Sequence, residues 1–150
     1  MDLDQYNNIV LAHRDSMIII GCIILLLCVL AIIFVELYVR GTLECKFFQL
    51  GKIKVSPTLL LLIPTMLVLI YFSMVVVNCN KDISLNAYET YIGTCIYQSE
   101  SVELVEQKIH IYVGKGHEIV PYGENYGKCI YAKYSKVIVH WEQLDTNSTS

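Results

Sequence analysis

The pentapeptide Gly-x-Cys-Ile-Tyr occurs twice in the sequence, as GTCIY at residues 93–97 and as GKCIY at residues 127–131. Around each copy, apolar and more polar side chains alternate with a period of two, and β-branched and aromatic residues are frequent. This pattern is typical of a β-strand. Each copy also places its cysteine on the same face as its tyrosine. We therefore predict that the two motifs form equivalent structural strands.

The similarity between the two copies extends beyond the pentapeptide. At a shift of 34 residues, Tyr88 matches Tyr122 and Ser101 matches Ser135. Two interpretations remain open, a duplicated strand-turn-strand unit or convergence on a strand-forming pentapeptide. Helical repeat proteins also have periods near this length, but the β-branched alternation excludes them.

The motifs belong to a polar C-terminal segment, residues 79–145, that is rich in tyrosine and β-branched residues. We expect a first strand at residues 88–98, a connection or one helical turn at residues 99–107, and a hairpin with a glycine-rich tip at residues 108–122. The apolar positions change parity near residues 134–136, which predicts a bulge or a turn there. The segment is therefore expected to be a small antiparallel β domain, a sandwich or a small barrel.

Two cysteines suggest how so small a domain is stabilised. A soluble segment of roughly 65 residues has a marginal core, and Cys95 and Cys129 occupy equivalent strand positions. If their strands are neighbours, the sulfurs can approach bonding distance, and an outside location would keep the bond oxidised. Such a disulfide would contribute about 3–4 kcal/mol. The alternative is a pair of buried free thiols.

Two uncharged apolar runs precede the β segment, MIIIGCIILLLCVLAIIFV from Met17 and TLLLLIPTMLVLIYFSMVVV from Thr58. Each is long enough to cross a bilayer as a helix, so we predict transmembrane helices at residues 17–39 and 58–78. The first run is too long for a signal-peptide core and has no cleavage pattern after it. Pro64 is expected to kink the second helix.

Lysine and arginine near the apolar runs predict the topology. The loop at residues 40–57 is basic, whereas residues 1–16 contain Arg14 alone and residue 81 is the nearest lysine after the second run. Under the positive-inside rule the loop is cytoplasmic, and both termini lie outside the cell membrane. The determinants of this topology are Arg40, Lys46, Lys52 and Lys54. The loop is interpreted as a plain connector or as a segment that rests on anionic lipid.

The predicted fold class is an α+β membrane protein with two transmembrane helices followed by a small antiparallel β domain. The expected segments are a short N-terminal tail (1–16), helix one (17–39), a basic cytoplasmic loop (40–57), helix two (58–78), the β-rich soluble domain (79–145) and a disordered tail (146–150).

No constellation of residues indicates catalysis. We find no nucleophile with a base and no phosphate loop, and His110, His117 and His140 lack the spacing of a zinc site. From Lys81 onward the chain has six lysines against nine carboxylates, which disfavours nucleic acid because phosphate contacts need a basic face. We therefore expect no enzyme activity, no cofactor, no metal and no nucleic-acid partner.

Tyrosine is frequent in the soluble segment, and tyrosine is enriched at protein interfaces, although it is equally a good strand former. The predicted interaction surface consists of Tyr91, Tyr97, Tyr112 and Tyr131. The first functional hypothesis is a non-catalytic accessory or regulatory protein, embedded in the lipid bilayer, that binds another membrane or surface protein or self-associates through its helices. The alternative is a membrane-tethered sensor or small-ligand-binding module.

Overall fold

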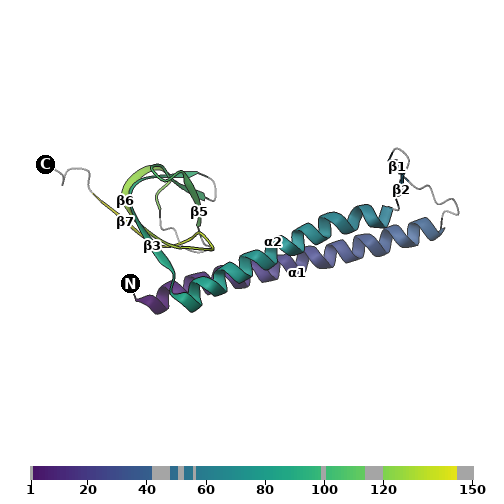
Figure 1. Cartoon of the computed structure of the whole chain (residues 1–150), viewed down its shortest axis with the longest axis horizontal. Coiled ribbons are helices and arrows are strands. Elements are labelled where there is room, and N and C mark those ends of the chain that lie inside the picture. The colour runs from purple at the N-terminus through teal and green to yellow at the C-terminus, as the bar shows by residue number, and fades with distance from the viewer. Residues whose placement is uncertain are drawn as a thin grey trace. The chain divides into compact units, whose positions relative to one another are not determined.

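The computed structural model describes residues 2–41, 48–50, 53–55, 57–98, 101–113 and 120–144 (Figure 1). The elements in chain order are α1 (Leu3–Gly41), β1 (Phe48–Leu50), β2 (Ile53–Val55), α2 (Pro57–Leu85), β3 (Tyr88–Gln98), β4 (Ser101–Leu104), β5 (Ile109–Val113), β6 (Gly123–Ala132) and β7 (Val137–Gln143). They form two compact units. The barrel unit comprises Met1–Ser16 and Val75–Ser150, and the helical unit comprises Met17–Met74.

Both predicted apolar runs are helical, and both helices extend beyond the predicted bounds. Each is long and apolar enough to cross a membrane by length and composition. The expected N-terminal tail is helical from Leu3. At its start the Asp2 carboxylate accepts the Leu3 backbone N–H (2.7 Å), and the Gln5 side chain accepts the Asp2 backbone N–H (3.3 Å). At the other end, α2 continues to Leu85. The expected N-terminal tail and the first residues of the expected β-rich segment, up to Leu85, are therefore parts of helices.

Inside the helical unit, α1 and α2 approach closely at a glycine. A Cβ atom added to Gly21 would lie 3.1 Å from Cγ of Phe72, so the missing side chain makes room for the ring. The α2 helix runs continuously through Pro64, and Thr65 Oγ1 donates to the Leu61 carbonyl (2.8 Å). The predicted loop contains the antiparallel pair of β1 and β2. Of its four cations, Arg40 ends up in α1 and Lys54 in β2, whereas Lys46 and Lys52 lie outside the described residues.

The remaining five strands close into a barrel in the order β3-β4-β5-β7-β6 (Figure 1). All neighbouring pairs are antiparallel except β5 and β7, which are parallel. The expectation of a purely antiparallel domain is thus wrong, and the sheet is mixed. The reason is topological: a closed ring with an odd number of strands cannot alternate direction throughout, so at least one pair must be parallel.

Strand β5 differs from its prediction in its partners. Residues 108–122 were expected to form a hairpin, but β5 pairs with β4 and β7, and the predicted tip lies in residues 114–119, outside the described part. Strand β4 occupies a stretch that was expected to be a connection or a helical turn. The predicted change of parity is confirmed, because a turn at residues 133–135 separates β6 from β7.

The twin motifs pair with each other. Strands β3 and β6 form the longest antiparallel ladder, and Gly93 lies directly opposite Gly127. A Cβ atom at Gly127 would lie 2.5 Å from both the Glu142 carbonyl oxygen and Cζ2 of Trp141. A Cβ atom at Gly93 would lie 2.5 Å from the hydroxyl oxygen of Tyr91. The two glycines therefore leave space for large aromatic side chains beside the ladder.

The barrel unit contains two hydrophobic cores. The first fills the barrel and includes Leu104, Ile111 and Trp141. The second packs the first turns of α1 and the end of α2 against β6 and β7, and its buried members are Ile9, Val10, Cys79, Ala132, Val137 and Val139. The second core explains why residues 3–16 are ordered as a helix, since their apolar side chains have a partner surface on the barrel.

Candidate functional site

The four predicted interface tyrosines do not share one surface. Tyr91 and Tyr131 are 5% and 2% exposed and belong to the barrel core, and Tyr97 packs against that core. Only Tyr112 is well exposed, at 49%. Positions 91 and 131 face inward because they have the same parity as the buried cysteines of their strands, a signal that the alternation pattern already contained.

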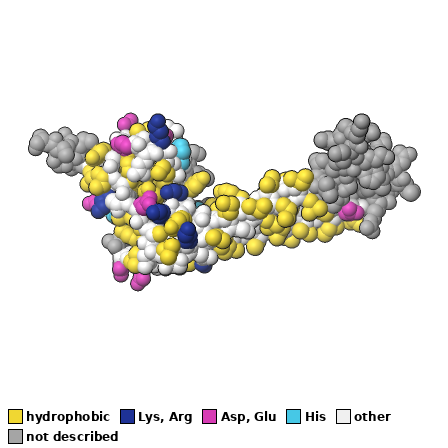
Figure 2. Space-filling view, viewed as in Figure 1, with side chains coloured by type: hydrophobic (Ala, Val, Ile, Leu, Met, Phe, Trp, Pro, Cys, Tyr) yellow, Lys and Arg dark blue, Asp and Glu magenta, His cyan; other side chains and the backbone are white. Residues whose placement is uncertain are grey.

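Other aromatic and aliphatic side chains occupy the outer barrel surface instead. Tyr122, Tyr126 and Ile92 are exposed, and Tyr126 pairs with Thr94 across the β3–β6 ladder, next to the Ile92–Lys128 pair. The Tyr97 and Tyr122 rings meet edge to face at 5.8 Å. Figure 2 shows hydrophobic side chains interspersed with charged ones over the barrel. The name aromatic face is used here for two exposed residues of the outer β3–β6 face, Ile92 and Tyr126, together with Tyr122, which immediately precedes β6.

The two motif cysteines lie on neighbouring strands, but they are free thiols. Cys95 is opposite Asn125, and Cys129 is opposite Tyr91. This offset of four residues separates them by about 13 Å along the ladder, at 3.3 Å per residue, whereas bonded cysteines have Cα atoms about 4.4–6.8 Å apart. Because of this register, Cys95 and Cys129 are too far apart to bond, and the expected disulfide is absent from the structure.

Burial keeps these thiols protonated. Removal from water raises the pKa of Cys95 to about 11, and burial followed by the nearby Cys95 raises the pKa of Cys129 to about 12. Since the thiolate is the reactive form of cysteine, both residues behave as small apolar core residues. Cys79, in the second core, is also fully buried.

One rim of the barrel carries a polar network centred on Tyr131. Its hydroxyl donates to Glu89 Oε2 (2.8 Å), Lys133 forms an ion pair with Glu89 Oε1 (3.2 Å), and Lys136 Nζ lies 5.1 Å from the Tyr131 ring centre. The hydrogen bond from Tyr131 lowers the pKa of Glu89. Burial, and then the bond to Glu89, raises the pKa of Tyr131 to about 12.

A buried carboxylate joins α2 to the β6–β7 turn. Asp82 is fully buried, and its Oδ1 and Oδ2 accept the backbone N–H groups of Tyr134 (2.8 Å) and Ser135 (2.7 Å). The ammonium group of Lys81 lies 3.8 Å from the centre of the Tyr134 ring. We call this arrangement of Asp82 with residues 134 and 135 the Asp82 clasp. The sequence did not reveal it, because one acidic residue after an apolar run resembles a solvated charge.

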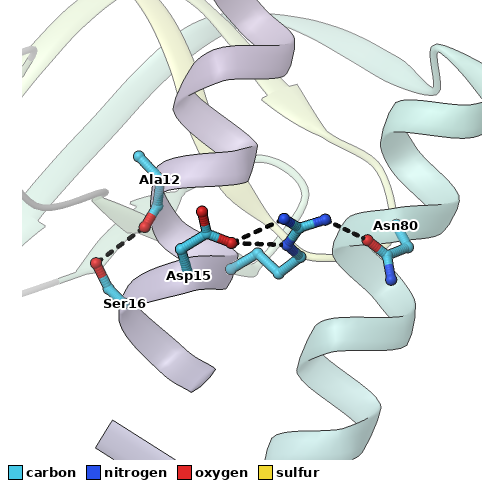
Figure 3. Close-up of polar contacts among 5 residues, drawn as sticks. Ala12, Asp15, Ser16 and Asn80 are labelled. Atoms are coloured by element: carbon cyan, nitrogen blue, oxygen red, sulfur yellow. Dashed lines mark hydrogen bonds and ion pairs between the residues drawn. The ribbon is translucent and has the colours of Figure 1, made fainter. Parts of the chain in front are cut away.

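The first turns of α1 are held by polar contacts as well. In Figure 3, Asp15 on α1 and Asn80 on α2 lie on either side of a guanidinium group, which is that of Arg14. Nε and Nη2 of Arg14 donate to Asp15 Oδ1 (2.9 and 2.8 Å), and Nη1 donates to Asn80 Oδ1 (2.9 Å). The Tyr88 hydroxyl donates to Asn7 Oδ1. These contacts fix the first turns of α1, within the barrel unit, against the end of α2 and the barrel.

These polar groups hold elements in position. Within the described ranges, no group of three His, Cys, Asp or Glu side chains is arranged to bind a metal ion. His110 is exposed on β5 and His140 is half-buried on β7, while His117 falls outside the described residues. The chemistry present is hydrogen bonding and ion pairing between elements of the fold. Searches of protein-family models, curated proteins and solved structures find no match to this chain.

Proposed function

We propose that the chain is an integral membrane protein whose two apolar helices span the bilayer. The observation that carries this proposal is the exposure of large apolar side chains along both helices, for example Leu26 (60%), Phe34 (70%) and Leu67 (62%), visible as continuous yellow surface in Figure 2. Such surface is unfavourable in water and favourable against lipid. Extraction of membranes with alkaline carbonate tests the proposal: the chain stays in the pellet, and its release into the supernatant would contradict membrane insertion.

The proposed role is non-catalytic: the barrel is a rigid module that presents its aromatic face to another membrane or surface protein, in an accessory or regulatory capacity. The exposure of Tyr122, at 78%, and of Tyr126 and Ile92 supports this face as the contact surface, because tyrosine gives a large contact area at a low entropic cost. The interior of the barrel is filled by the side chains of the first hydrophobic core.

Site-directed photo-crosslinking in intact cells tests this role. A photo-crosslinking amino acid in place of Tyr126 is expected to give a discrete crosslinked product. The matched control carries the same amino acid at Lys108, which is exposed in the turn between β4 and β5 and is not part of the aromatic face. Equal products at both positions, or no product at position 126, would contradict the proposed contact surface.

The proposed orientation places the 40–57 loop in the cytoplasm and both termini outside the cell membrane. The cations of the loop support it, and the inclusion of residues 1–16 and of the barrel in one compact unit requires that the two lie on the same side. A membrane-impermeant thiol reagent tests this orientation, since an exposed cysteine introduced as Thr90→Cys is expected to react in intact cells while Cys45 is not. The reverse result would invert the topology.

A second candidate function is a small-ligand-binding module. The observation that favours it is the indole nitrogen of Trp141, which is buried and has no hydrogen-bond partner in the described part of the chain. A buried donor without a partner is available to a ligand oxygen. Trp141 is also the sole tryptophan of the sequence, so its fluorescence reports occupancy directly. Unchanged emission across a broad metabolite screen would leave this candidate without support.

A further inference from the structure

In the barrel unit, most cations lie on the elements around the Asp82 clasp, whereas most carboxylates lie elsewhere. Four cations, Arg14, Lys81, Lys133 and Lys136, belong to the elements joined around the Asp82 clasp. We call these four residues the cationic collar. The other described charges of the unit, apart from the partners of the collar, are two lysines and six carboxylates: Lys108, Lys128, Asp2, Asp4, Glu103, Glu106, Glu124 and Glu142. The unit therefore has a basic collar and an acidic remainder.

The carboxylates near the collar neutralise only part of its charge. Asp15 is paired with Arg14, and Glu89 with Lys133, while Asp82 is buried and occupied by backbone N–H groups. Within the described part of the chain, Lys81 and Lys136 have no ion-pair partner and contact aromatic rings instead. A net positive charge thus remains available at the collar.

Two cations of the collar are close, along their own helices, to the uncharged runs. Arg14 precedes Met17 by three residues, and Lys81 follows Val77 by four, which corresponds to about 4.5–6 Å along a helix. The β6–β7 turn is held at the level of Lys81, because the Asp82 clasp binds its backbone. Cations and tyrosines at this distance from an apolar run occupy the headgroup layer of a bilayer.

The turn is also preorganised. Its two clasped N–H groups, the bond from the Lys136 N–H to the Ala132 carbonyl (3.0 Å) and the positive φ of Lys136 (58°) define one backbone conformation. Tyr134, under the Lys81 ammonium, adds an amphipathic ring of the kind that is enriched at membrane interfaces. A lysine ammonium beside such a ring suits a lipid phosphodiester, which accepts charge-assisted hydrogen bonds.

We propose that the cationic collar binds the headgroups of anionic phospholipids. The acidic remainder of the barrel unit is repelled by the same surface, so the two effects together orient the barrel on the membrane. A net-negative lipid is favoured over a zwitterionic one, because the choline group of the latter cancels the phosphate charge. The inference rests on the proposed insertion of the helices and goes beyond it by naming the lipid class.

Native mass spectrometry of the full-length protein tests this inference. Protein in detergent is mixed with equal amounts of phosphatidylglycerol and phosphatidylcholine, and the retained lipids are counted. The wild type is expected to retain phosphatidylglycerol preferentially. In the triple variant Lys81→Gln, Lys133→Gln, Lys136→Gln, the ratio of retained phosphatidylglycerol to phosphatidylcholine is expected to fall about tenfold or more. The reason is that each lysine near an anionic surface contributes to lipid attraction.

Two controls separate charge from folding. The triple Lys→Arg variant at the same positions keeps the charge and is expected to keep the preference. Lys108→Gln with Lys128→Gln removes two charges outside the collar and is expected to change nothing. Equal retention of both lipids by the wild type, or an unchanged preference in the triple glutamine variant, would overturn the inference. Carbonate extraction of the same variants reports membrane insertion separately, so a failure there would point to the proposed function instead.

Discussion

At the scale of single residues, the glycines of the twin motifs are positions where a side chain has no room. Gly93 and Gly127 face each other in the ladder, and their missing side chains are replaced by the aromatic groups of Tyr91 and Trp141. The two positions differ in what a methyl group would meet. At Gly127 the obstacle includes a backbone carbonyl, whereas at Gly93 it consists of the ends of the Tyr91 and Glu106 side chains.

Gly127→Ala is therefore expected to destabilise the barrel by about 1–3 kcal/mol, the usual range for overpacking a core. Gly93→Ala is expected to cost less, because side-chain ends can move aside. Denaturant unfolding of the full-length protein in detergent, followed by Trp141 fluorescence, measures both. Thr90→Ala, at an exposed position of the same strand, is the control. A larger loss for Gly93→Ala than for Gly127→Ala would contradict the packing argument.

The buried tyrosines make stability depend on alkaline pH. The pKa of Tyr131 is raised to about 12 in the folded state, above an unfolded value of about 10. Its contribution is therefore complete below pH 10 and is lost as the pH rises toward 12. Tyr131→Phe removes the titrating group, so we expect a shallower loss of stability over this range. The loss persists in part, because the pKa of Tyr88 is also raised to about 12. Thermal unfolding between pH 9 and pH 12 measures this, and identical profiles would be inconsistent with it.

At the scale of elements, the Asp82 clasp joins the C-terminal end of α2 to the β6–β7 turn. The α2 helix ends at Leu85, next to Asn86, whose φ of 48° gives the left-handed conformation common where helices stop. The chain then enters β3, and Tyr88 at the start of β3 pairs with Ala132 at the end of β6, so this short region meets both strands at the same end of the β3–β6 ladder. The two hydrogen bonds that the Asp82 carboxylate accepts therefore hold the turn beside the C-terminal end of α2.

Asp82→Ala leaves two buried N–H groups without an acceptor and is expected to destabilise the barrel unit by about 2–4 kcal/mol. Asp82→Asn keeps one acceptor oxygen, so its stability is expected to lie between that of Asp82→Ala and that of the wild type. Hydrogen exchange at the amides of Tyr134 and Ser135 localises the effect, and these amides are expected to lose protection first. Ser84→Ala, exposed on the same helix, is the control. Unchanged protection at the two amides would show that the clasp does not hold the turn.

At the scale of the whole molecule, the second hydrophobic core makes the two ends of the chain interdependent. Val10 and Cys79 come from the two helices, and Val137 and Val139 come from β7. The barrel therefore uses both faces of β7, one toward its own interior and one toward the helices. Removal of either helix segment would expose the second core to water.

A fragment of residues 75–144 is thus expected to be less stable than the same fragment joined by a flexible linker to residues 2–16. Residues 75–85 cover part of Val137 and Val139 in both fragments, but the cover from Ile9 and Val10 is present only in the second. Burial of one such side chain contributes about 1.5–3 kcal/mol. Thermal unfolding of the two fragments measures the difference. A linked fragment with Val10→Asp is the matched control and is expected to unfold like the shorter one. Equal stability of all three would contradict the role of the second core.

The sequence predicts the local parts of this fold and misses the parts that depend on pairing. Uncharged runs predict both helices, alternation predicts the strand at residues 88–98, and the change of parity predicts the turn before β7. The closure of the barrel is a property of all five strands together, and no single stretch contains it.

The same limit applies to the candidate site. Equivalent positions of Cys95 and Cys129 suggested a bond, but two antiparallel copies that meet at their glycines place the cysteines on opposite sides of the meeting point. The Asp82 clasp is a contact between residues about 50 positions apart, with sequence separations of 52 and 53. Burial of Tyr91 and Tyr131 was accessible from parity alone, because each lies an even number of residues from its cysteine.

The meeting of Gly93 with Gly127 has a consequence for the origin of the repeat. The register is symmetric about this pair, so Cys95 lies opposite Asn125 as Cys129 lies opposite Tyr91. A strand with this motif is self-complementary and can pair with an identical copy across a local two-fold axis. If the repeat arose by duplication of one strand-turn-strand unit, the two identical strands could have paired in this register at once, without further substitutions.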